Sequence, residues 1–409
     1  MNFQTNSTLC PLKVLVVNPL TPASQLTIVK ILSGSVFGCN QLIDLILLVY
    51  SNEKPFAEAF KLELSGCAFS CNNSIEVSSN LPSLLDADVF CFMSNFTNPN
   101  KIDIEKINID EQFDSLYLII KVAHNLLGKC FTEEEMVDDA PTVLKKKNKS
   151  PKKHVKTIIV ADGLATMDIL VSLSKNVPTD IFFCPTAITG VAKSVLGDYL
   201  KVQCNLINDV HIWAANDEVL HAEVNTPIIV SDAVGDLPKC DWEAVGKDQL
   251  DSFNLDYTQF NASWMKKEFI EKVTTCASKN PYGCIYRAAE FAKTLRAIWV
   301  SRSSETGNKV YCNLGVISDG SLGTIKGYPY VLPVILFGDY WTVNKYLEDD
   351  THLKQEIKRI NKAVKDHHRK LIPYCKKFLE ENILNNVFVR TDDESSLCTV
   401  LDNSTRSNN

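Results

Sequence analysis

The first candidate for chemistry is a turn within residues 13–38, KVLVVNPLTPASQLTIVKILSGSVFG. A buried strand, a tight turn and a helix in this order bind pyrophosphate when glycines let the backbone approach it and N–H groups at the helix N-terminus are free. This turn contains no glycine, and Pro19 and Pro22 have no N–H to donate. Side chains stand at three more of its positions: Asn18, Thr21 and Ser24. The sequence therefore predicts that the architecture of a dinucleotide-binding unit is kept while its phosphate chemistry is lost.

The histidines are the second group that could do chemistry, as acids and bases. His124 lies in an apolar helical stretch, which is typical of a hydrogen-bonded core histidine. His367 and His368 lie in a charged helical segment, so we expect them to be solvated. Asp319, in GVISDG, is interpreted as a turn residue before a glycine rather than as an acid.

The fourteen cysteines are the third group, and they are scattered along the chain. Cys67 and Cys71 form the closest pair, and no second pair at zinc spacing accompanies them. Residues 1–10 have neither the basic nor the apolar region of a signal peptide, which predicts a cytoplasmic protein. We therefore expect reduced core thiols and no metal site.

The segments that would position these groups alternate in type through the first half of the chain. Apolar runs predict strands at the start of residues 13–38 and at 42–50, 86–95 and 156–162. Helical spacing follows at residues 55–64 and 112–129. Alternating strands and helices of these lengths predict βαβ crossovers and a doubly wound parallel sheet.

The second half of the chain has a different pattern. It predicts a strand at residues 208–219, amphipathic helices at 263–275 and 287–301, two strands joined by a glycine-containing turn within 310–337, and a long surface helix at 353–371. The polar residues at the C-terminal end are expected to be disordered.

Composition excludes several classes of partner. The 409 residues suit two lobes, and 45% hydrophobic with 22% charged residues is ordinary for a globular protein. A net charge of −7 gives no reason to expect nucleic acid, and no apolar run reaches the roughly 18 residues of a membrane span. The basic run KKKNKSPKKHVK at residues 145–156 is interpreted as a solvated loop, with nuclear localisation or phosphate binding as alternatives.

Three passages together resemble malate dehydrogenases of the cytosolic type. They are SGSVFG at residues 33–38, NDVHIW at 208–213, and GVISDG at 315–320 with LPV at 332–334; RAIW at 296–299 fits as well. The resemblance is collinear from about residue 11 to about residue 385 and is closest to the divergent malate dehydrogenase 1B branch. That branch usually carries an additional N-terminal domain, which this chain is expected to lack.

The resemblance implies a two-lobed α/β fold that commonly forms a homodimer. Its Rossmann-like, NAD-binding-type lobe is a doubly wound parallel sheet, and its substrate lobe is of the α+β, C-terminal type of lactate and malate dehydrogenases. The expected divisions are an N-terminal tail at residues 1–10, the first lobe at 11–162, the second at 163–388 and a disordered tail at 389–409.

Carried over one position at a time, the cofactor positions of this family fall on residues of other types. The glycine turn falls on Asn18 and Thr21, with Ser24 at the next helical position. The acid that bonds the adenosine ribose falls on Val49, which cannot accept a hydrogen bond. The asparagine that contacts nicotinamide and substrate falls on Asp162, which would repel an anionic substrate. The resemblance therefore implies a degenerate NAD site.

The dicarboxylate-binding positions differ in the same way. The loop that brings two arginines to the substrate falls near Asn98, where Lys101 is a poor substitute because one flexible ammonium replaces a bidentate guanidinium. Two further arginines fall on Thr186 and Val191 within TAITGV, and a serine of the carboxylate pocket falls on Gly283.

The catalytic pair also falls on residues without acid–base chemistry. The histidine falls on Asn216 and its aspartate partner on Ile188. His211 lies five positions before Asn216, so continuation of the strand would place it on the opposite face. His221 is expected in a loop and is not predicted to be a recruited base. Since a positioned base contributes roughly 10²–10⁴-fold to a rate, its loss alone would leave little turnover.

These positions predict a malate dehydrogenase-like pseudoenzyme with a structural or protein-binding role and no bound cofactor. The resemblance to the 1B branch implies an axonemal or sperm scaffold as a setting. One alternative is an NAD-dependent malate dehydrogenase that interconverts malate and oxaloacetate with rearranged residues. Another is a sensor that takes an uncharged ligand in a cleft made apolar by Ile188, Val191 and Val49.

Overall fold

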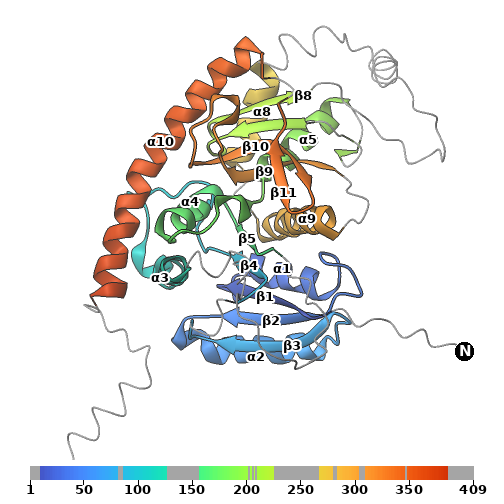
Figure 1. Ribbon diagram of the computed structural model, residues 1–409, viewed down its shortest axis with the longest axis vertical. Coiled ribbons are helices and arrows are strands. Elements are labelled where there is room, and N and C mark those ends of the chain that lie inside the picture. Colours follow the sequence, from blue (N-terminus) through green and yellow to red (C-terminus); the bar gives the residue numbers. More distant parts are fainter. Residues whose placement is uncertain are drawn as a thin grey trace, which may run out of the picture.

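The frame of the protein is one mixed β-sheet with helices on both faces (Figure 1). The computed structural model describes residues 10–81, 86–126, 156–200, 203–204, 207, 210–224, 267–279, 283–303, 309–345 and 348–385. Within these ranges the sheet has eleven strands in the order β3-β2-β1-β4-β5-β6-β9-β10-β7-β8, and β11 pairs with β10.

The first six strands are parallel to one another, and crossover helices join several of them. They are β1 (Leu12–Val17), β2 (Ile43–Leu48), β3 (Asn72–Ser78), β4 (Val89–Phe92), β5 (Ile158–Ala161) and β6 (Phe182–Cys184). Four helices accompany them: α1 (Pro22–Leu32), α2 (Lys54–Gly66), α3 (Ile109–Asn125) and α4 (Leu164–Leu173). The predicted strands and helices of this half are confirmed, and the parallel part continues past residue 162 through α4 to β6.

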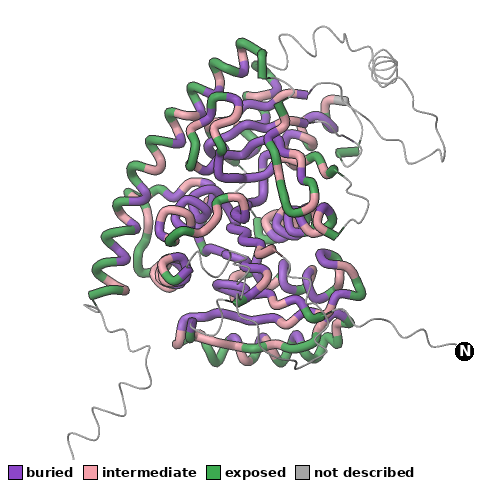
Figure 2. The backbone as a smooth tube through the Cα atoms, in the orientation of Figure 1, coloured by how far each residue is buried: buried purple, intermediate pink, exposed green. Residues whose placement is uncertain are grey.

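The two faces of the parallel strands bury two separate hydrophobic clusters. Val14 and Val16 of β1 pack in one cluster with α1 and α2, while Leu15 and Val17 pack in the other with α3 and α4. Successive residues of a strand point to opposite faces, so an apolar run such as LKVLVV can serve both clusters. Figure 2 shows β1 and β2 as mostly buried. The predicted doubly wound sheet is confirmed.

From β6 onward the sheet is antiparallel. Its strands are β9 (Val310–Ile317), β10 (Pro329–Phe337), β11 (Tyr340–Val343), β7 (Val210–Ala214) and β8 (Leu220–Val224). The helices of this half are α5 (Ala187–Leu200), α8 (Ile270–Lys279), α9 (Cys284–Ser303) and α10 (Thr351–Leu379). The two strands predicted within residues 310–337 are confirmed as β9 and β10, and the turn between them holds three glycines with positive φ: Gly320, Gly323 and Gly327.

Helix α10 is longer than the sequence predicted and covers both clusters. Its N-terminal half buries Leu353, Ile357, Ile360 and Val364 against one cluster, as their spacing predicted. Beyond residue 371 it continues through Pro373 and buries a further set of residues against the other cluster: Ile372, Cys375, Phe378 and Leu379. The helix thus runs alongside β8, β7, α4 and α3 (Figure 1).

Some expectations from the sequence fall partly or wholly outside the described residues. These are the tails at residues 1–9 and 386–409, most of the basic run at 145–156, the end of the helix predicted at 112–129 and the start of that predicted at 263–275. Lys156, the last residue of the basic run, forms an ion pair with Asp180. In the described part of the chain no helix is both long and apolar enough to cross a membrane.

The expectation of core thiols is wrong for most of the described cysteines. Four are buried: Cys71, Cys91, Cys184 and Cys375. Six are exposed: Cys10, Cys39, Cys67, Cys204, Cys276 and Cys284. All the described cysteines are free. The exposed cysteines lie in loops and on outer helix faces, where spacing in the sequence does not reveal exposure.

The expectation that His367 and His368 are solvated is also wrong, because α10 packs against α4. His368 Nδ1 lies 2.9 Å from both carboxylate oxygens of Asp168, which is buried on α4. The hydrogen bond with Asp168 raises the pKa of His368 above its usual value. Burial lowers the pKa of His367, although the Asp168 charge acts against that change.

We expect the His368–Asp168 pair to make stability depend on pH. A histidine whose pKa is raised on folding contributes stability below its unfolded pKa of about 6.5, and this is lost as pH rises through the folded value. The variant His368→Gln should therefore lose melting temperature relative to the wild type at about pH 5.5 and approach it near pH 8.5, with a difference of about 2 °C. His367 is present in both proteins and cancels from the comparison. Parallel melting curves of the two proteins across this range would contradict the prediction.

Candidate functional site

The site predicted from the sequence lies at the carboxyl ends of the parallel strands, and its first part is the turn after β1. Asn18 has the left-handed backbone (φ 56°) for which asparagine is better suited than most residues. Its side-chain Nδ2 donates to Met93 O at 2.7 Å and to Ser115 Oγ at 3.0 Å. The side chain is thereby held inside the protein, where 6% of the residue is exposed.

The start of α1 uses its polar groups internally. Thr21 caps the helix by accepting from Ser24 N at 3.3 Å, and Thr21 O accepts from Gln25 N. Ser24 is fully buried and its Oγ donates to Asn18 O at 2.8 Å. Pro22, at the first helical position, has no N–H. Of the groups that could hold a phosphate at the N-terminus of α1, Pro22 therefore has no N–H, and the N–H of Ser24 is already bonded to the side chain of Thr21.

Val49 lies directly after β2 and is fully buried. Its N–H donates to Ser78 O at 3.0 Å, and its side chain offers no acceptor. Val49 thus occupies the position expected from the sequence, at the end of the strand.

Asp162, directly after β5, is the centre of a buried polar network. Its Oδ2 accepts from Ser94 N at 2.9 Å, from Ser94 Oγ at 2.7 Å and from Arg287 Nη2, while its Oδ1 accepts from Thr166 Oγ1 at 3.0 Å. Arg287 also donates to Ser94 O at 2.9 Å. The expectation that Asp162 repels anions is therefore wrong, because the Arg287 guanidinium pairs with its charge.

Arg287 is the site residue that sequence reasoning missed. It lies on α9, 125 positions from Asp162, within a helix whose apolar spacing predicts nothing about its polar residues. Its side chain is 14% exposed and that of Asp162 is 2% exposed. No local signal could have identified the pair, since only the packing of α9 against the sheet brings the two residues together.

The loop around Asn98 is bonded to the turn that follows β7. Asn98 Nδ2 donates to Asp217 Oδ2 at 2.6 Å, and Asn100 Nδ2 donates to Asp217 Oδ1 at 3.1 Å. Lys101 forms an ion pair with Glu218. The expected role of Lys101 as a partial substitute for a substrate-binding arginine is therefore not supported, because its ammonium already has a protein partner.

The catalytic-pair positions hold a turn and a core residue. Asn216 Oδ1 accepts from Glu218 N and Val219 N, each at 2.9 Å, which closes the turn between β7 and β8. Ile188 is buried in the core. β7 ends at Ala214, so the strand-face argument for His211 does not extend to Asn216. The expectation that His221 is in a loop is wrong, because it is buried on β8.

The remaining positions that the resemblance assigns to the substrate lie at the start of α5 and just before α9. Thr186 is buried and its Oγ1 donates to Asn313 O at 3.0 Å. Val191 is half-buried against the core cluster that contains Ile188. Gly283 is exposed just before α9, where an added Cβ would contact nothing within 4 Å.

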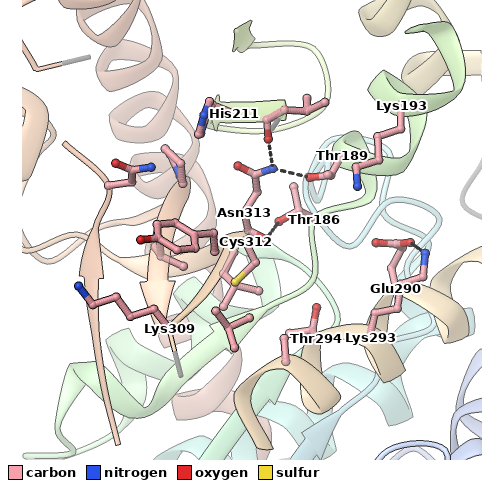
Figure 3. Close-up of a pocket in the computed structure, with 18 residues that line it drawn as sticks. Thr186, Thr189, Lys193, His211, Glu290, Lys293, Thr294, Lys309, Cys312 and Asn313 are labelled. Atoms are coloured by element: carbon pink, nitrogen blue, oxygen red, sulfur yellow. Dashed lines mark hydrogen bonds and ion pairs between the residues drawn. The ribbon is translucent and has the colours of Figure 1, made fainter. Parts of the chain in front are cut away.

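A pocket of about 680 Å³ opens between α5, α9 and the strands β9 and β10 (Figure 3). Asn313 lies at one wall, where its Nδ2 donates to Thr189 Oγ1 at 3.2 Å and to Val210 O at 2.7 Å. Lys193, Glu290 and Lys293 form another wall. Burial, followed by the charge of Lys293, lowers the pKa of Lys193.

The expectation that Ile188, Val191 and Val49 make a cleft apolar is wrong. Ile188 and Val49 are buried core residues, and none of the three lines this pocket. The pocket is instead lined by several charged groups, among them the two lysines and the glutamate of α5 and α9. Apolar residues such as Val210, Leu314 and Val334 make up much of the remaining lining.

Comparison with known proteins supports the resemblance on which these positions were assigned. No protein-family model matches the chain. The chain is 24% identical to human cytoplasmic malate dehydrogenase over 343 residues, which covers 81% of this chain and 88% of the relative. It is 23% identical to the human protein named Putative malate dehydrogenase 1B over 351 residues, which covers 83% of this chain and 59% of that protein.

Solved structures agree on the fold. Malate dehydrogenase from Naegleria fowleri matches with a TM-score of 0.61 and 16% identity over 89% of this chain and 98% of that chain. Lactate dehydrogenase from Trichomonas vaginalis in complex with NADH and oxamate matches with a TM-score of 0.64 and 13% identity over 90% and 99%.

The sheet order and these structures define a Rossmann-like α/β protein with the fold of malate and lactate dehydrogenases. Within that class, the sequence resembles cytoplasmic malate dehydrogenases and malate dehydrogenase 1B. The recognition made from SGSVFG, NDVHIW and GVISDG is confirmed.

Proposed function

We propose that this protein is a malate dehydrogenase-like pseudoenzyme whose role is structural or protein-binding. The observation that carries the proposal is the use made of Asn216, the residue at the position of the catalytic histidine. Its amide oxygen accepts two backbone N–H groups of a turn, and an amide has no proton to exchange near neutral pH. A general base contributes roughly 10²–10⁴-fold, and its aspartate partner is replaced by buried Ile188.

The residues at the expected cofactor-binding positions support the same proposal. The Asn18–Ser24 turn is filled by its own side chains, and the N–H groups of Ser24 and Gln25 at the start of α1 are bonded within the protein. The end of β2 offers buried Val49 in place of a carboxylate that could bind the ribose hydroxyls. Both principal anchors of a dinucleotide are missing at the positions that the resemblance assigns to them.

The polar groups near the expected substrate positions are bonded to other residues of the protein. Arg287 is bonded to Asp162, and Asn98 and Asn100 are bonded to Asp217. A dicarboxylate would have to compete with these carboxylates for the few cationic and amide groups present. Losing charged clamps on an anion typically costs about 2–5 kcal/mol of binding free energy.

Several further features belong to this proposal. We propose that the nucleotide-type lobe comprises residues 11–162 and the C-terminal-type lobe residues 163–388, that the protein is cytoplasmic, and that it forms a homodimer. The partner of a scaffold role is proposed to be a protein of the axoneme or sperm, as the resemblance to the 1B branch implies.

The second candidate is an active NAD-dependent malate dehydrogenase. It is favoured by 24% identity to human cytoplasmic malate dehydrogenase over most of both chains. This candidate requires that other residues replace the base, the ribose anchor and the arginine clamps.

Turnover and melting measurements on the purified full chain separate the two candidates. With NADH and oxaloacetate we expect no oxidation of NADH above the rate without protein, and no rise in melting temperature with NADH alone, because a ligand stabilises only the state that binds it. A cytoplasmic malate dehydrogenase assayed in parallel is the positive control. Turnover in this protein would overturn the pseudoenzyme proposal in favour of the dehydrogenase, whereas a melting shift without turnover would favour a nucleotide-binding sensor.

A further inference from the structure

Three side chains with metal-binding atoms meet where the edge strand β8 contacts the start of α10. A nitrogen from each of His221 and His352 and a carboxylate oxygen of Glu223 lie within 4.8 Å of one another. We propose that these three residues bind one divalent transition-metal ion, of which zinc is the best match. The spacing of cysteines and histidines in the sequence predicted no metal site, because the ligands come from two elements separated by more than 120 positions.

Strand geometry and helix packing bring the three residues together. His221 and Glu223 are two positions apart on β8, so their side chains leave the same face of the sheet. His352 is the second residue of α10, which packs against β8. The imidazole rings of His221 and His352 lie 5.3 Å apart, and the indole of Trp213 lies 5.8 Å from His221 on its other side.

Two nitrogens at this place are buried without a partner. Nδ1 of His221 and Nδ1 of His352 are inaccessible to solvent and accept or donate no hydrogen bond within the described part of the chain. His221 as a whole is only 1% exposed. An unsatisfied buried polar atom typically costs about 1–3 kcal/mol, so such atoms are rare in native proteins. Because Glu223 lies beside Nε2 of His221, one ion would bind that nitrogen together with the carboxylate, and it could also bind the partnerless Nδ1 of His352.

A hydrogen bond to His221 holds Glu223, the third proposed ligand, within the cluster. Glu223 Oε1 lies 2.8 Å from His221 Nε2 and is 23% exposed, so its carboxylate can reach both the ring and solvent. As a direct ligand beside two imidazoles, this carboxylate supplies the negative charge that a dication requires.

The donor set selects the class of ion. Two imidazole nitrogens and one carboxylate oxygen suit zinc, with a fourth position left for water, whereas magnesium and calcium prefer oxygen ligands. Zinc–nitrogen bonds of about 2.0–2.1 Å place tetrahedral ligand atoms about 3.4 Å apart. On binding, His221 Nε2 and Glu223 Oε1, now 2.8 Å apart, would therefore separate slightly, and any ligand pair nearer the 4.8 Å limit would close up. Arg359, which donates to Leu220 O, and the N-terminus of α10 add nearby positive charge. We therefore expect weaker binding than in a four-ligand structural site.

Such an ion would join the edge of the sheet to the helix that covers it. β8 is the last strand in the sheet order, and α10 covers both hydrophobic clusters. Metal binding at its first turn would anchor the helix to the strand and stabilise the folded state by mass action.

Zinc titration of the chelator-treated full chain tests the proposal. We expect one equivalent to bind in calorimetry and the melting temperature to rise with zinc but not with magnesium. His352→Gln and Glu223→Gln should each weaken zinc binding at least tenfold and reduce the melting shift. The matched control His124→Gln removes a partly exposed histidine elsewhere and should bind as the wild type does. These variants avoid the fully buried His221, whose replacement endangers folding, and near-UV circular dichroism confirms that each is folded.

Cobalt(II) spectra distinguish this site from the exposed cysteines. Cobalt bound to nitrogen and oxygen shows weak d–d bands, whereas cobalt bound to thiolate adds an intense sulfur-to-metal charge-transfer band. We expect only the weak bands, and we expect them to disappear in His352→Gln. Absence of saturable zinc binding, unchanged affinity in both variants, or a charge-transfer band at the first equivalent would each overturn the proposal.

Discussion

Replacing Arg287 with alanine is expected to lower the free energy of unfolding by about 3–5 kcal/mol. The reason is the carboxylate that remains: the side chain of Asp162 is 2% exposed and would lose its cationic partner. Ser94 and Thr166 would still donate to it, but these neutral donors do not balance the charge. Urea denaturation of the purified variant measures the loss.

The double variant Asp162→Asn/Arg287→Met separates the buried charge from the packing. Removing both charges should cost less than removing Arg287 alone, because a buried ion pair contributes little net stability and an unpaired buried charge costs much. Lys293→Ala is the matched control on the same helix, since that lysine is 71% exposed and pairs with Glu290 at the surface. Its change should stay within about 1 kcal/mol. A cost below about 1 kcal/mol for Arg287→Ala would show that Asp162 does not depend on the guanidinium.

The second large effect is expected from Gly163→Ala. A Cβ at this position would lie 2.2 Å from Pro99 O and 2.8 Å from Asn100 N, and both are backbone atoms that cannot rotate away. Moving the 99–100 segment would break the bonds from Ala165 N to Pro99 O and from Leu164 N to Asn100 Oδ1, each 3.2 Å. We expect a loss of about 3 kcal/mol or more, because overpacking against rigid backbone lies at the upper end of such costs.

Thermal melting of the soluble variant measures the effect of Gly163→Ala, and Gly66→Ala is its control. Gly66 ends α2, and an added Cβ there would contact nothing within 4 Å. Alanine in a helix is favoured over glycine by about 0.5–1 kcal/mol, so this variant should melt at the same temperature or slightly higher. Equal melting temperatures for the two variants would mean that the loop at Pro99 yields easily.

The main elements of the parallel half follow from local patterns. LKVLVV and IDLILL are apolar on both faces, which suits strands buried between two helical layers. α10 began as predicted from the spacing of Leu353, Ile357 and Ile360, but its end was missed. Beyond residue 371 the helix meets a different hydrophobic cluster, and periodicity within one segment does not indicate which surface lies beneath it.

For the candidate site as well, the sequence indicated residue types but not the partners of those residues. The absence of glycine from the turn that contains Asn18, Thr21 and Ser24 is visible in the sequence, and backbone approach to a phosphate depends on the residue types of one such short segment. The partners of those residues were not visible. Asn18 bonds to Met93 and Ser115, more than 70 positions away, and Asn98 bonds to Asp217 on the other half of the sheet.

By itself, the sequence determined the class of fold and the strand and helix types, because each depends on neighbours within a few residues. Tertiary structure alone decided that Asp162 is neutralised by Arg287, that Asp168 holds His368, and that His221, Glu223 and His352 meet. An ion pair or a set of metal ligands forms only where faces of distant elements come together, and the periodicity within one segment does not predict which faces these are.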